Sequence, residues 1–310
     1  MINLQGKDIL HGAQFSREEL ERIMDVADMF RNQLETRPSL DYLHGYILAA
    51  LFFEPSTRTR LSFETAMHRL GGSVVGFSSA ESTSVTKGET LEDTIRTVDQ
   101  YVDFIAMRHP ALGSASRAAE IAKAPVLNGG DGAGQHPTQA LLDLYTVRSE
   151  RGQIDGTTLV LCGDLKNGRT VHSGVEVYKH YQVRLVFVAP EQLRMPAVIT
   201  ARLKSLGIQF EETDDLTNAL KKADVLYMTR IQKERFTKAE DYERLKDSYI
   251  LTRQMVENLN PKVVTLHPLP RVNEIATDVD TLPGAAYFRQ ARNGVYIRMA
   301  LLALIAGKIQ

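Results

Sequence analysis

The chain has 310 residues, and at roughly 100 to 200 residues per domain this length indicates about two domains. Hydrophobic residues make up 43% and charged residues 24%, which is typical of a globular chain and excludes a disordered or fibrous protein. The 37 Lys and Arg residues nearly cancel the 38 Asp and Glu residues, so the net charge of −1 predicts neither a nucleic-acid partner nor binding to an acidic membrane surface.

The first predicted helix follows Ser16. Glu19 stands three positions after this serine, which is the pattern of a capping box, and apolar residues recur at the helical period from Ile23 to Leu34. The patterns that follow predict, in chain order, a strand at 46–53, a helix at 59–71, a strand at 73–77, a helix from Gly88, a strand at 104–107, a short helix, a strand at 126–127 and a helix at 137–151.

A turn-rich segment at 151–156 interrupts this series, and an apolar strand at 158–162 restarts it. Further strands are expected at 184–188, 208–210, 225–228 and 263–266, with helices between them. The last helix, at 294–307, is apolar on most faces, so we expect it to pack back against the first domain.

Such alternation is typical of the α/β class, here two doubly wound domains with mostly parallel sheets. The expected first domain is 1–150 together with the C-terminal helix at about 291–310, and the second is 151–290.

The compartment is predicted from the cysteine content and the termini. The one cysteine, Cys162, lies in an apolar run and can form neither an intrachain disulfide nor a cysteine-rich zinc site. The N-terminus has no basic-then-apolar signal, and the longest apolar stretch, 299–306, is far shorter than the ~18 residues of a membrane span. We therefore expect a cytoplasmic protein without a membrane partner.

The most informative motif is Ser56-Thr57-Arg58-Thr59-Arg60, which follows a strand and opens a helix. Its hydroxyls and guanidiniums lie where the free N–H groups of a helix N-terminus point, an arrangement suited to a phosphate. No P-loop and no G-x-G-x-x-G is present, so a nucleotide is not implied. The alternative is an ordinary N-cap with surface arginines.

Further cations follow other predicted strands, at Arg108, Arg169 and Arg230. In open parallel sheets ligands bind outside the carboxyl ends of the strands, so these arginines favour an anion pocket, although each alone could be a surface charge. His136 precedes a proline suited to the first position of a helix and could equally cap or pack, and Lys87 lies in a polar loop where a solvated lysine is the ordinary alternative.

The loop at 267–271 contains two prolines, which impose an unusual backbone path that could expose carbonyl groups to a ligand. A cis bond before Pro270 is one option.

Several catalytic motifs are missing from the sequence. There is no G-x-S-x-G elbow, no H-E-x-x-H and no paired-cysteine metal motif, so we expect neither a metal nor a cofactor. What remains is a set of arginines, hydroxyls and one histidine, suited to holding two anionic substrates together and stabilising charge on an oxygen.

Four motifs, Ser56–Arg60, 107–110, 136–139 and 267–271, in this order and at these separations resemble those of the transcarbamoylases, and among them the aspartate carbamoyltransferases. The resemblance extends over nearly the whole chain. It implies transfer of the carbamoyl group of carbamoyl phosphate to the amine of L-aspartate, the committed step of pyrimidine synthesis. The first domain would bind carbamoyl phosphate and the second aspartate.

The resemblance also implies a role for each matching residue. Those expected at the reacting groups are Arg58, Thr59, Lys87, Arg108 and His136. Carbamoyl phosphate would be held by Ser56, Thr57, Arg58, Thr59, Ser84, Lys87, Arg108, His136, Gln139, Pro268 and Leu269. Aspartate would be held by Lys87, Arg169, Arg230, Gln232, Leu269 and Pro270. The departing phosphate is the candidate proton acceptor, because no side-chain base is evident.

In this family a loop serine and lysine act in the active site of a neighbouring subunit, so the resemblance implies a homotrimer in which Ser84, or Thr83, and Lys87 work in trans. Regulatory chains as further partners stay open. Gly129 stands where the family pattern has alanine, a change expected to leave the chemistry unaltered.

Two alternatives are an ornithine carbamoyltransferase and an inactive scaffold. The first characteristically carries a Ser-Met-Gly segment where this chain has 229–232, and Arg169 and Arg230 would repel a second ammonium group. The second predicts loss of a site residue, and none is lost.

Overall fold

The computed structural model describes residues 3–132, 134–233 and 236–309. The chain divides into two compact units. Unit 1 comprises Met1–Leu142 and Arg292–Gln310, and unit 2 comprises Asp143–Ala291. Each unit is built on one parallel sheet, which confirms the expected α/β class with two domains.

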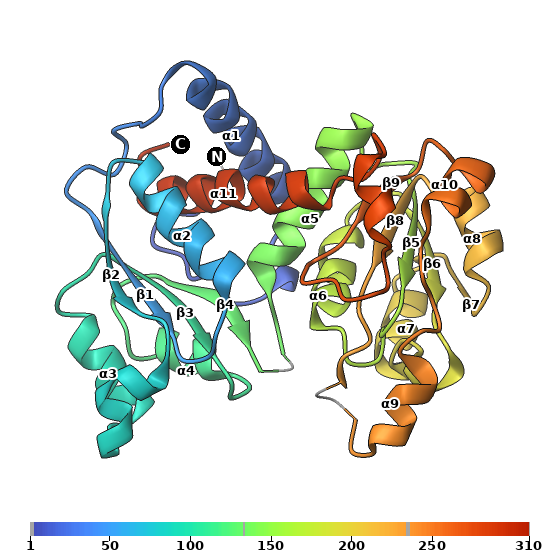
Figure 1. Ribbon diagram of the computed structural model, residues 1–310. Helices are drawn as coiled ribbons and strands as arrows, with labels where there is room; N and C mark the ends of the chain where they lie inside the picture. Colours follow the sequence, from blue (N-terminus) through green and yellow to red (C-terminus); the bar gives the residue numbers. More distant parts are fainter. Residues whose placement is uncertain (1–2, 133, 234–235, 310) are drawn as a thin grey trace. The chain divides into compact units, whose positions relative to one another are not determined.

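Unit 1 carries a four-stranded sheet in the order β2-β1-β3-β4 (Figure 1). Its strands are β1 (Ile47–Phe52), β2 (Ser73–Phe77), β3 (Phe104–His109) and β4 (Val126–Asp131). Its helices are α1 (Arg17–Thr36), α2 (Thr57–Arg69), α3 (Leu91–Val98) and α4 (Ser114–Ala119), with the 3-10 turns η1 (Gly12–Gln14), η2 (Ala80–Ser82) and η3 (Ser84–Lys87). The helices α5 (Pro137–Arg151) and α11 (Tyr287–Ile305) contribute to both units.

The sheet of unit 1 is buried on both faces at its centre, as parallel sheets require. Alternate residues of β1 and β3, such as Leu51 and Met107, pack with Ile95 of α3 and Ala118 of α4. The other face is covered by α2 (Figure 1). The edge strand β2 is largely exposed.

The capping box at the start of α1 is confirmed, because Glu19 N donates to Ser16 Oγ at 3.2 Å and Ser16 N donates to Glu19 Oε2 at 2.9 Å. The helix expected from Gly88 begins later, at Leu91. Gly88 has a φ of +94° and closes η3, and Thr90 then caps α3 by accepting from Asp93 N at 3.1 Å.

The C-terminal residues pack on unit 1, as the apolar last helix predicts. Gly6 N donates to Ile305 O at 2.9 Å. The buried Arg298 donates from Nη2 to Thr138 Oγ1 at 3.0 Å, and its guanidinium lies 4.8 Å from the Phe63 ring centroid. The helix itself begins earlier than expected, at Tyr287 rather than at 294.

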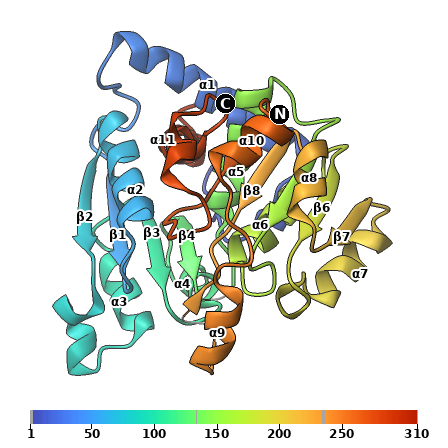
Figure 2. The same cartoon turned by 45° about the vertical axis from the view of Figure 1, so that its right-hand side comes forward.

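Unit 2 carries a five-stranded sheet in the order β7-β6-β5-β8-β9 (Figure 1). Figure 2 shows its strands β6, β7 and β8 from another side. Its strands are β5 (Thr158–Cys162), β6 (Arg184–Val188), β7 (Phe210–Thr213), β8 (Val225–Met228) and β9 (Val264–Leu266). Its remaining helices are α6 (Arg169–Tyr178), α7 (Ala197–Ser205), α8 (Leu216–Lys222), α9 (Ala239–Leu245) and α10 (Arg253–Leu259), with the 3-10 turns η4 (Glu191–Leu193) and η6 (Thr277–Thr281).

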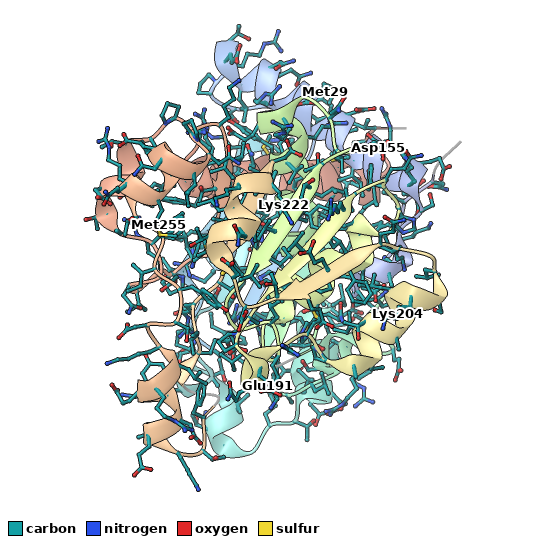
Figure 3. All side chains as sticks on the ribbon, turned by 90° about the vertical axis from the view of Figure 1, so that its right-hand side faces the viewer. Met29, Asp155, Glu191, Lys204, Lys222 and Met255 are labelled. Atoms are coloured by element: carbon teal, nitrogen blue, oxygen red, sulfur yellow. The ribbon has the colours of Figure 1, made fainter. Side chains whose placement is uncertain are left out.

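One face of this sheet packs on α8 and α10, where Val160 and Leu226 meet Leu220 and Val256. Figure 1 shows α6 on the opposite face. Two lysines labelled in Figure 3, Lys204 on α7 and Lys222 on α8, contact side chains of the outer strand β7. Lys204 Nζ lies 5.6 Å from the Phe210 ring centroid, and Lys222 Nζ lies 3.9 Å from Glu211 Oε1.

The division between the units falls inside α5, nearer the N-terminus than the turn at 151–156 where the sequence predicts it. The physical reason is Asp143, a buried carboxylate on α5. Asp143 accepts from Tyr227 Oη at 2.8 Å and from Gln290 Nε2 at 2.6 Å, so the C-terminal part of α5 belongs to the core of unit 2.

Candidate active site

The topology of each sheet marks one position where ligands bind. In an open parallel sheet this is the crevice outside the carboxyl ends of the two strands at which the strand order reverses. In unit 1 these strands are β1 and β3, and in unit 2 they are β5 and β8. The predicted site residues lie at the carboxyl ends of strands or in the segments that follow them, in one sheet or the other.

In unit 1 the phosphate motif lies at the start of α2. Ser56 is the N-cap residue, in extended conformation, and its side chain accepts no capping hydrogen bond. Thr57 and Arg58 are exposed in the first turn, whereas Thr59 is buried. The N-terminus of this helix therefore presents both backbone N–H groups and a positive end to an anion.

Arg108, at the end of β3, lies beside this helix start. Its Nε donates to Glu54 Oε1 at 2.6 Å and its Nη1 to Ser56 Oγ at 3.5 Å. The Arg108 side chain is only 16% exposed and that of Glu54 28%, so the pair is partly shielded from water. Glu54 fixes the orientation of the guanidinium, because an Arg–carboxylate bond is directional. Sequence reasoning missed this role of Glu54, although the residue lies only two positions before Ser56.

His136 reaches the same place from the loop after β4. Its Nε2 lies 3.4 Å from Thr59 Oγ1, and both side chains are buried. The buried carboxylate of Asp131 holds this loop, accepting from Gln135 N at 2.6 Å and from Gly113 N at 2.9 Å. Asp131 is thus a second supporting residue that the sequence did not single out.

Gln139 is nearly buried in the first turn of α5, three residues after His136. Ser84 and Lys87 are exposed on η3, in the segment that follows β2. The Thr83 hydroxyl is used inside this loop, donating to Ala80 O at 2.7 Å and accepting from Val85 N at 3.3 Å. This use favours Ser84 over Thr83 as the hydroxyl that the loop presents.

In unit 2 the loops after β5 and β8 are in close contact. A Cβ on Gly163 would lie 2.2 Å from Thr229 O, so only glycine permits this approach. The Thr229 hydroxyl accepts from Asp164 N at 3.1 Å. Arg169, the first residue of α6, and Arg230, just after β8, follow these two adjoining strand ends and are half-buried.

Gln232 joins the same two loops, because its Nε2 donates to Asn167 O at 3.3 Å. Asn167 is in turn held by Asp164, whose Oδ1 accepts from Asn167 N at 3.0 Å. Arg169 and Arg230 are therefore carried by two loops that are joined by hydrogen bonds at the carboxyl ends of β5 and β8.

The loop after β9 lies at the same edge, since β9 neighbours β8. The Leu269–Pro270 bond is cis, as the sequence allowed, and Leu269 has a φ of +53°. Pro268 and Leu269 are half-buried and Pro270 is exposed.

Cys162 is fully buried at the end of β5, and burial raises the pKa of its thiol well above the ordinary value. A thiol in this state is a poor nucleophile. In the part of the chain that the structure describes, no group of three His, Cys, Asp or Glu residues could hold a metal ion. Within the same part of the chain, the longest helices lack the run of apolar residues that crossing a membrane requires.

Both parts of the chain match models of known protein families. Residues 7–149 match the family model of the aspartate/ornithine carbamoyltransferase carbamoyl-P binding domain, and 155–305 match that of the Asp/Orn binding domain. Over 306 residues the chain is 54% identical to the aspartate carbamoyltransferase catalytic subunit of Thermococcus kodakarensis, covering 99% of each chain. The corresponding subunit of Methanopyrus kandleri is 50% identical, again over 99% of each chain.

Solved structures of the same kind of protein are similar to this chain over nearly its whole length. The catalytic subunit of M. jannaschii aspartate transcarbamoylase is similar with a TM-score of 0.91 and 48% identity, covering 97% of this chain and 98% of that one. Aspartate transcarbamoylase from Trypanosoma cruzi, in complex with carbamoyl phosphate and aspartate, has a TM-score of 0.92 and 42% identity, covering 97% of both chains.

Proposed function

The chain belongs to the aspartate/ornithine carbamoyltransferase family, and from this premise we propose how its residues transfer the carbamoyl group of carbamoyl phosphate to L-aspartate. The products are N-carbamoyl-L-aspartate and phosphate, and the reaction serves pyrimidine synthesis. The observation that carries the proposal is the grouping in unit 1 of a helix N-terminus, an oriented arginine and the Thr59–His136 pair.

In unit 1 the start of α2 binds the phosphate. Ser56, Thr57 and Thr59 offer hydroxyls and backbone N–H groups, and Arg58 adds a charge. Arg108, His136 and Thr59 donate to the carbonyl oxygen, which becomes negative as the amine attacks. The side-chain oxygen of Gln139 accepts from the carbamoyl amide. Donors already fixed by Glu54 and Asp131 need little reorganisation during the reaction.

In unit 2 the aspartate carboxylates bind Arg169, Arg230 and Gln232. Two guanidiniums at adjoining strand ends suit a dicarboxylate, and they disfavour ornithine, whose side chain ends in an ammonium group. The amine lies by the backbone of Leu269 and Pro270.

The reaction proceeds by attack of the neutral amine on the carbonyl carbon. A C–N bond forms, the C–O bond to phosphate breaks, and the carbonyl oxygen carries the negative charge in between. The amine gives up a proton, and the departing phosphate accepts it.

We further propose that the active enzyme is a homotrimer, in which Ser84 and Lys87 serve the site of a neighbouring subunit. Their exposure on η3 supports this role. Regulatory chains would be additional partners. We place the enzyme in the cytoplasm, where a lone buried thiol such as Cys162 stays reduced.

The direct test incubates the purified chain with carbamoyl phosphate and, in separate reactions, L-aspartate or L-ornithine. Ureido product with aspartate alone is expected. Product with ornithine alone would overturn the assignment of Arg169 and Arg230, and product with neither from a folded trimer would favour the inactive scaffold.

Shared sites are tested by mixing two inactive variants, Lys87→Ala and Arg58→Ala. Subunit exchange is expected to restore part of the activity, because some interfaces then combine a normal Arg58 site with a normal Lys87 from the neighbour. If subunits exchange and activity stays absent, the trans assignment is wrong.

A further inference from the structure

The segment Pro268–Pro270 has no backbone N–H group to offer a ligand. The two prolines carry none. The N–H group of Leu269, the remaining residue of the segment, donates to His267 Nδ1 at 2.7 Å. The polar backbone groups left to this segment are therefore carbonyl oxygens, which accept hydrogen bonds and repel anions.

The bond from Leu269 also defines the protonation of His267. Because Nδ1 accepts a hydrogen bond, it carries no proton, and the ring proton is on Nε2. His267 Nε2 lies 2.7 Å from Glu274 Oε1, so it donates to that carboxylate. His267 is 1% exposed and Glu274 4% exposed, and the pair is therefore closed to water.

Glu274 is itself well anchored. Its Oε2 accepts from Val272 N and Asn273 N, each at 3.1 Å. Burial disfavours the charged carboxylate, but the bond from His267 and the backbone bonds outweigh this effect, so the pKa of Glu274 lies below its ordinary value. In the charged form of Glu274 both carboxylate oxygens are acceptors. Oε1 can therefore accept from His267 Nε2 while Oε2 accepts from the backbone.

The backbone of His267 is fixed as well. Its N–H donates to Gln290 Oε1 at 2.9 Å, and Gln290 Nε2 donates to the buried Asp143 at 2.6 Å. The ring is thus bonded to Glu274 and the main chain to Gln290, which is itself bonded to Asp143, so the backbone at the start of Pro268–Pro270 is fixed.

We propose that His267, oriented by Glu274, is a positioning residue that turns Pro268–Pro270 into a strip of backbone acceptors and so selects the amine of the incoming amino acid. This proposal rests on the proposed function. Arg169 and Arg230 then recognise the two carboxylates, which any dicarboxylate has. The carbonyl groups of Pro268–Pro270 recognise the amine that reacts.

Two isosteric substitutions of His267 test its two side-chain hydrogen bonds one at a time, the bond from Leu269 N–H and the bond to Glu274. Asn places its Oδ1 near the position of Nδ1, so His267→Asn keeps the acceptor for Leu269 N–H and loses the link to Glu274. Gln places its Nε2 near the ring Nε2, so His267→Gln keeps the donor to Glu274 and loses the acceptor. We expect His267→Gln to raise KM for aspartate by about tenfold and His267→Asn by under about threefold.

Succinate, a dicarboxylate without an amine, is the probe that separates positioning from general damage. As a competitive inhibitor it needs the arginines alone, so its inhibition constant is expected to stay within about twofold in His267→Gln. Inhibition by inorganic phosphate, which binds unit 1, is expected to be unchanged. Equal losses of aspartate and succinate binding, or equal KM values in the Asn and Gln variants, would overturn the proposal.

Glu274→Gln is the second variant and covers the case in which His267→Gln does not fold. In the Gln variant the amide oxygen stays with the two backbone N–H groups, and the NH2 end faces the ring. The ring Nε2 must then accept, so the ring proton moves to Nδ1 and the acceptor for Leu269 N–H is lost, as in His267→Gln. The same selective rise in aspartate KM is expected. Glu211→Gln, an exposed control on β7, should leave all constants unchanged.

The wild-type assay separates this proposal from the proposed function. If the wild-type chain forms no carbamoyl aspartate, the proposed function itself fails. If wild type is active and Glu274→Gln keeps the wild-type aspartate KM, only the positioning role fails.

Discussion

The two strand-end sites use different parts of the chain to recognise their ligands. In unit 1 the side chains of Arg108 and Thr59, with the N-terminus of α2, supply donors for an anion. In unit 2 the arginines share the edge with a segment whose polar backbone groups are acceptors. The first edge therefore suits an anion such as a phosphate with a developing oxyanion beside it, and the second suits a molecule with both carboxylates and an amine.

The support behind the two sites differs in the same way. Unit 1 orients a cation with the partly exposed carboxylate of Glu54, whereas unit 2 orients a backbone segment through the buried pair His267 and Glu274. In our proposal the chain thus uses the strand ends of one parallel sheet for an anion and those of the other for an amine. Variants at the two edges should consequently fail in different kinetic constants.

Arg108→Ala is expected to have the largest effect. Loss of a donor to the developing oxyanion should lower kcat by roughly 100-fold or more, measured by steady-state product formation. The control is Arg117→Ala, which removes another arginine of unit 1 that is paired with a glutamate but whose side chain is exposed on α4. Turnover near the wild-type rate in Arg108→Ala would remove this residue from the reacting groups.

Arg230→Ala should act on binding instead. Loss of a charge-assisted bond to a carboxylate is expected to raise KM for aspartate by about 10- to 100-fold and to weaken succinate inhibition equally. KM for carbamoyl phosphate should stay near the wild-type value. Arg184→Ala, which removes an exposed arginine on β6, is the matched control. Unchanged aspartate binding and turnover in Arg230→Ala would contradict the role given to Arg230.

The sequence predicted most of the fold, because the strands are short apolar runs bounded by turns and the helices carry caps. Four strands have the expected bounds, and the helix at 137–151 matches to the residue. Misplaced boundaries occur where a local conformation overrides the pattern. Gly88 closes a 3-10 turn where a helix was expected to begin, and β4 continues to Asp131 beyond its apolar part.

The sequence points to a candidate site most directly where the residues are contiguous, as at Ser56–Arg60. The supporting carboxylates were not predictable, because their roles depend on partners remote in sequence. Glu54 meets Arg108 54 positions later, and Asp143 meets Gln290 147 positions later. The proposed role of Glu274 follows only from the structure, since spacing alone does not show that His267 accepts a bond from Leu269.

The stability of unit 2 should carry a pH dependence that comes from Glu274. A carboxyl group whose pKa is lowered by folding stabilises the fold above its ordinary value of 4.5, and that contribution is lost as the pH falls through the lower pKa of the folded protein. Glu274→Gln is expected to lower Tm by a few degrees at pH 7, corresponding to about 1–3 kcal/mol. The difference from wild type should shrink below pH 4.5.

Thermal unfolding of both proteins from pH 7 to pH 3.5 measures this difference. A Tm difference that is constant through this range would show that the charge of Glu274 contributes nothing. Glu211→Gln again serves as the control, because its exposed ion pairs are expected to contribute little.

Gly129→Ala should have the smallest effect and tests how tightly unit 1 holds Thr59. A Cβ at this position would lie 3.1 Å from Met107 O and 3.3 Å from Thr59 Cγ2, so the threonine must yield by a few tenths of an ångström. We expect kcat to fall by about twofold with unchanged aspartate KM, since only unit 1 is disturbed. Gly174→Ala in α6, where the nearest contact would be 3.5 Å, should leave kcat unaltered and raise Tm slightly. A kcat at the wild-type level in Gly129→Ala would show that Thr59 can move without cost, and the oxyanion site would then depend on Arg108 and His136 more than on the packing of this helix turn.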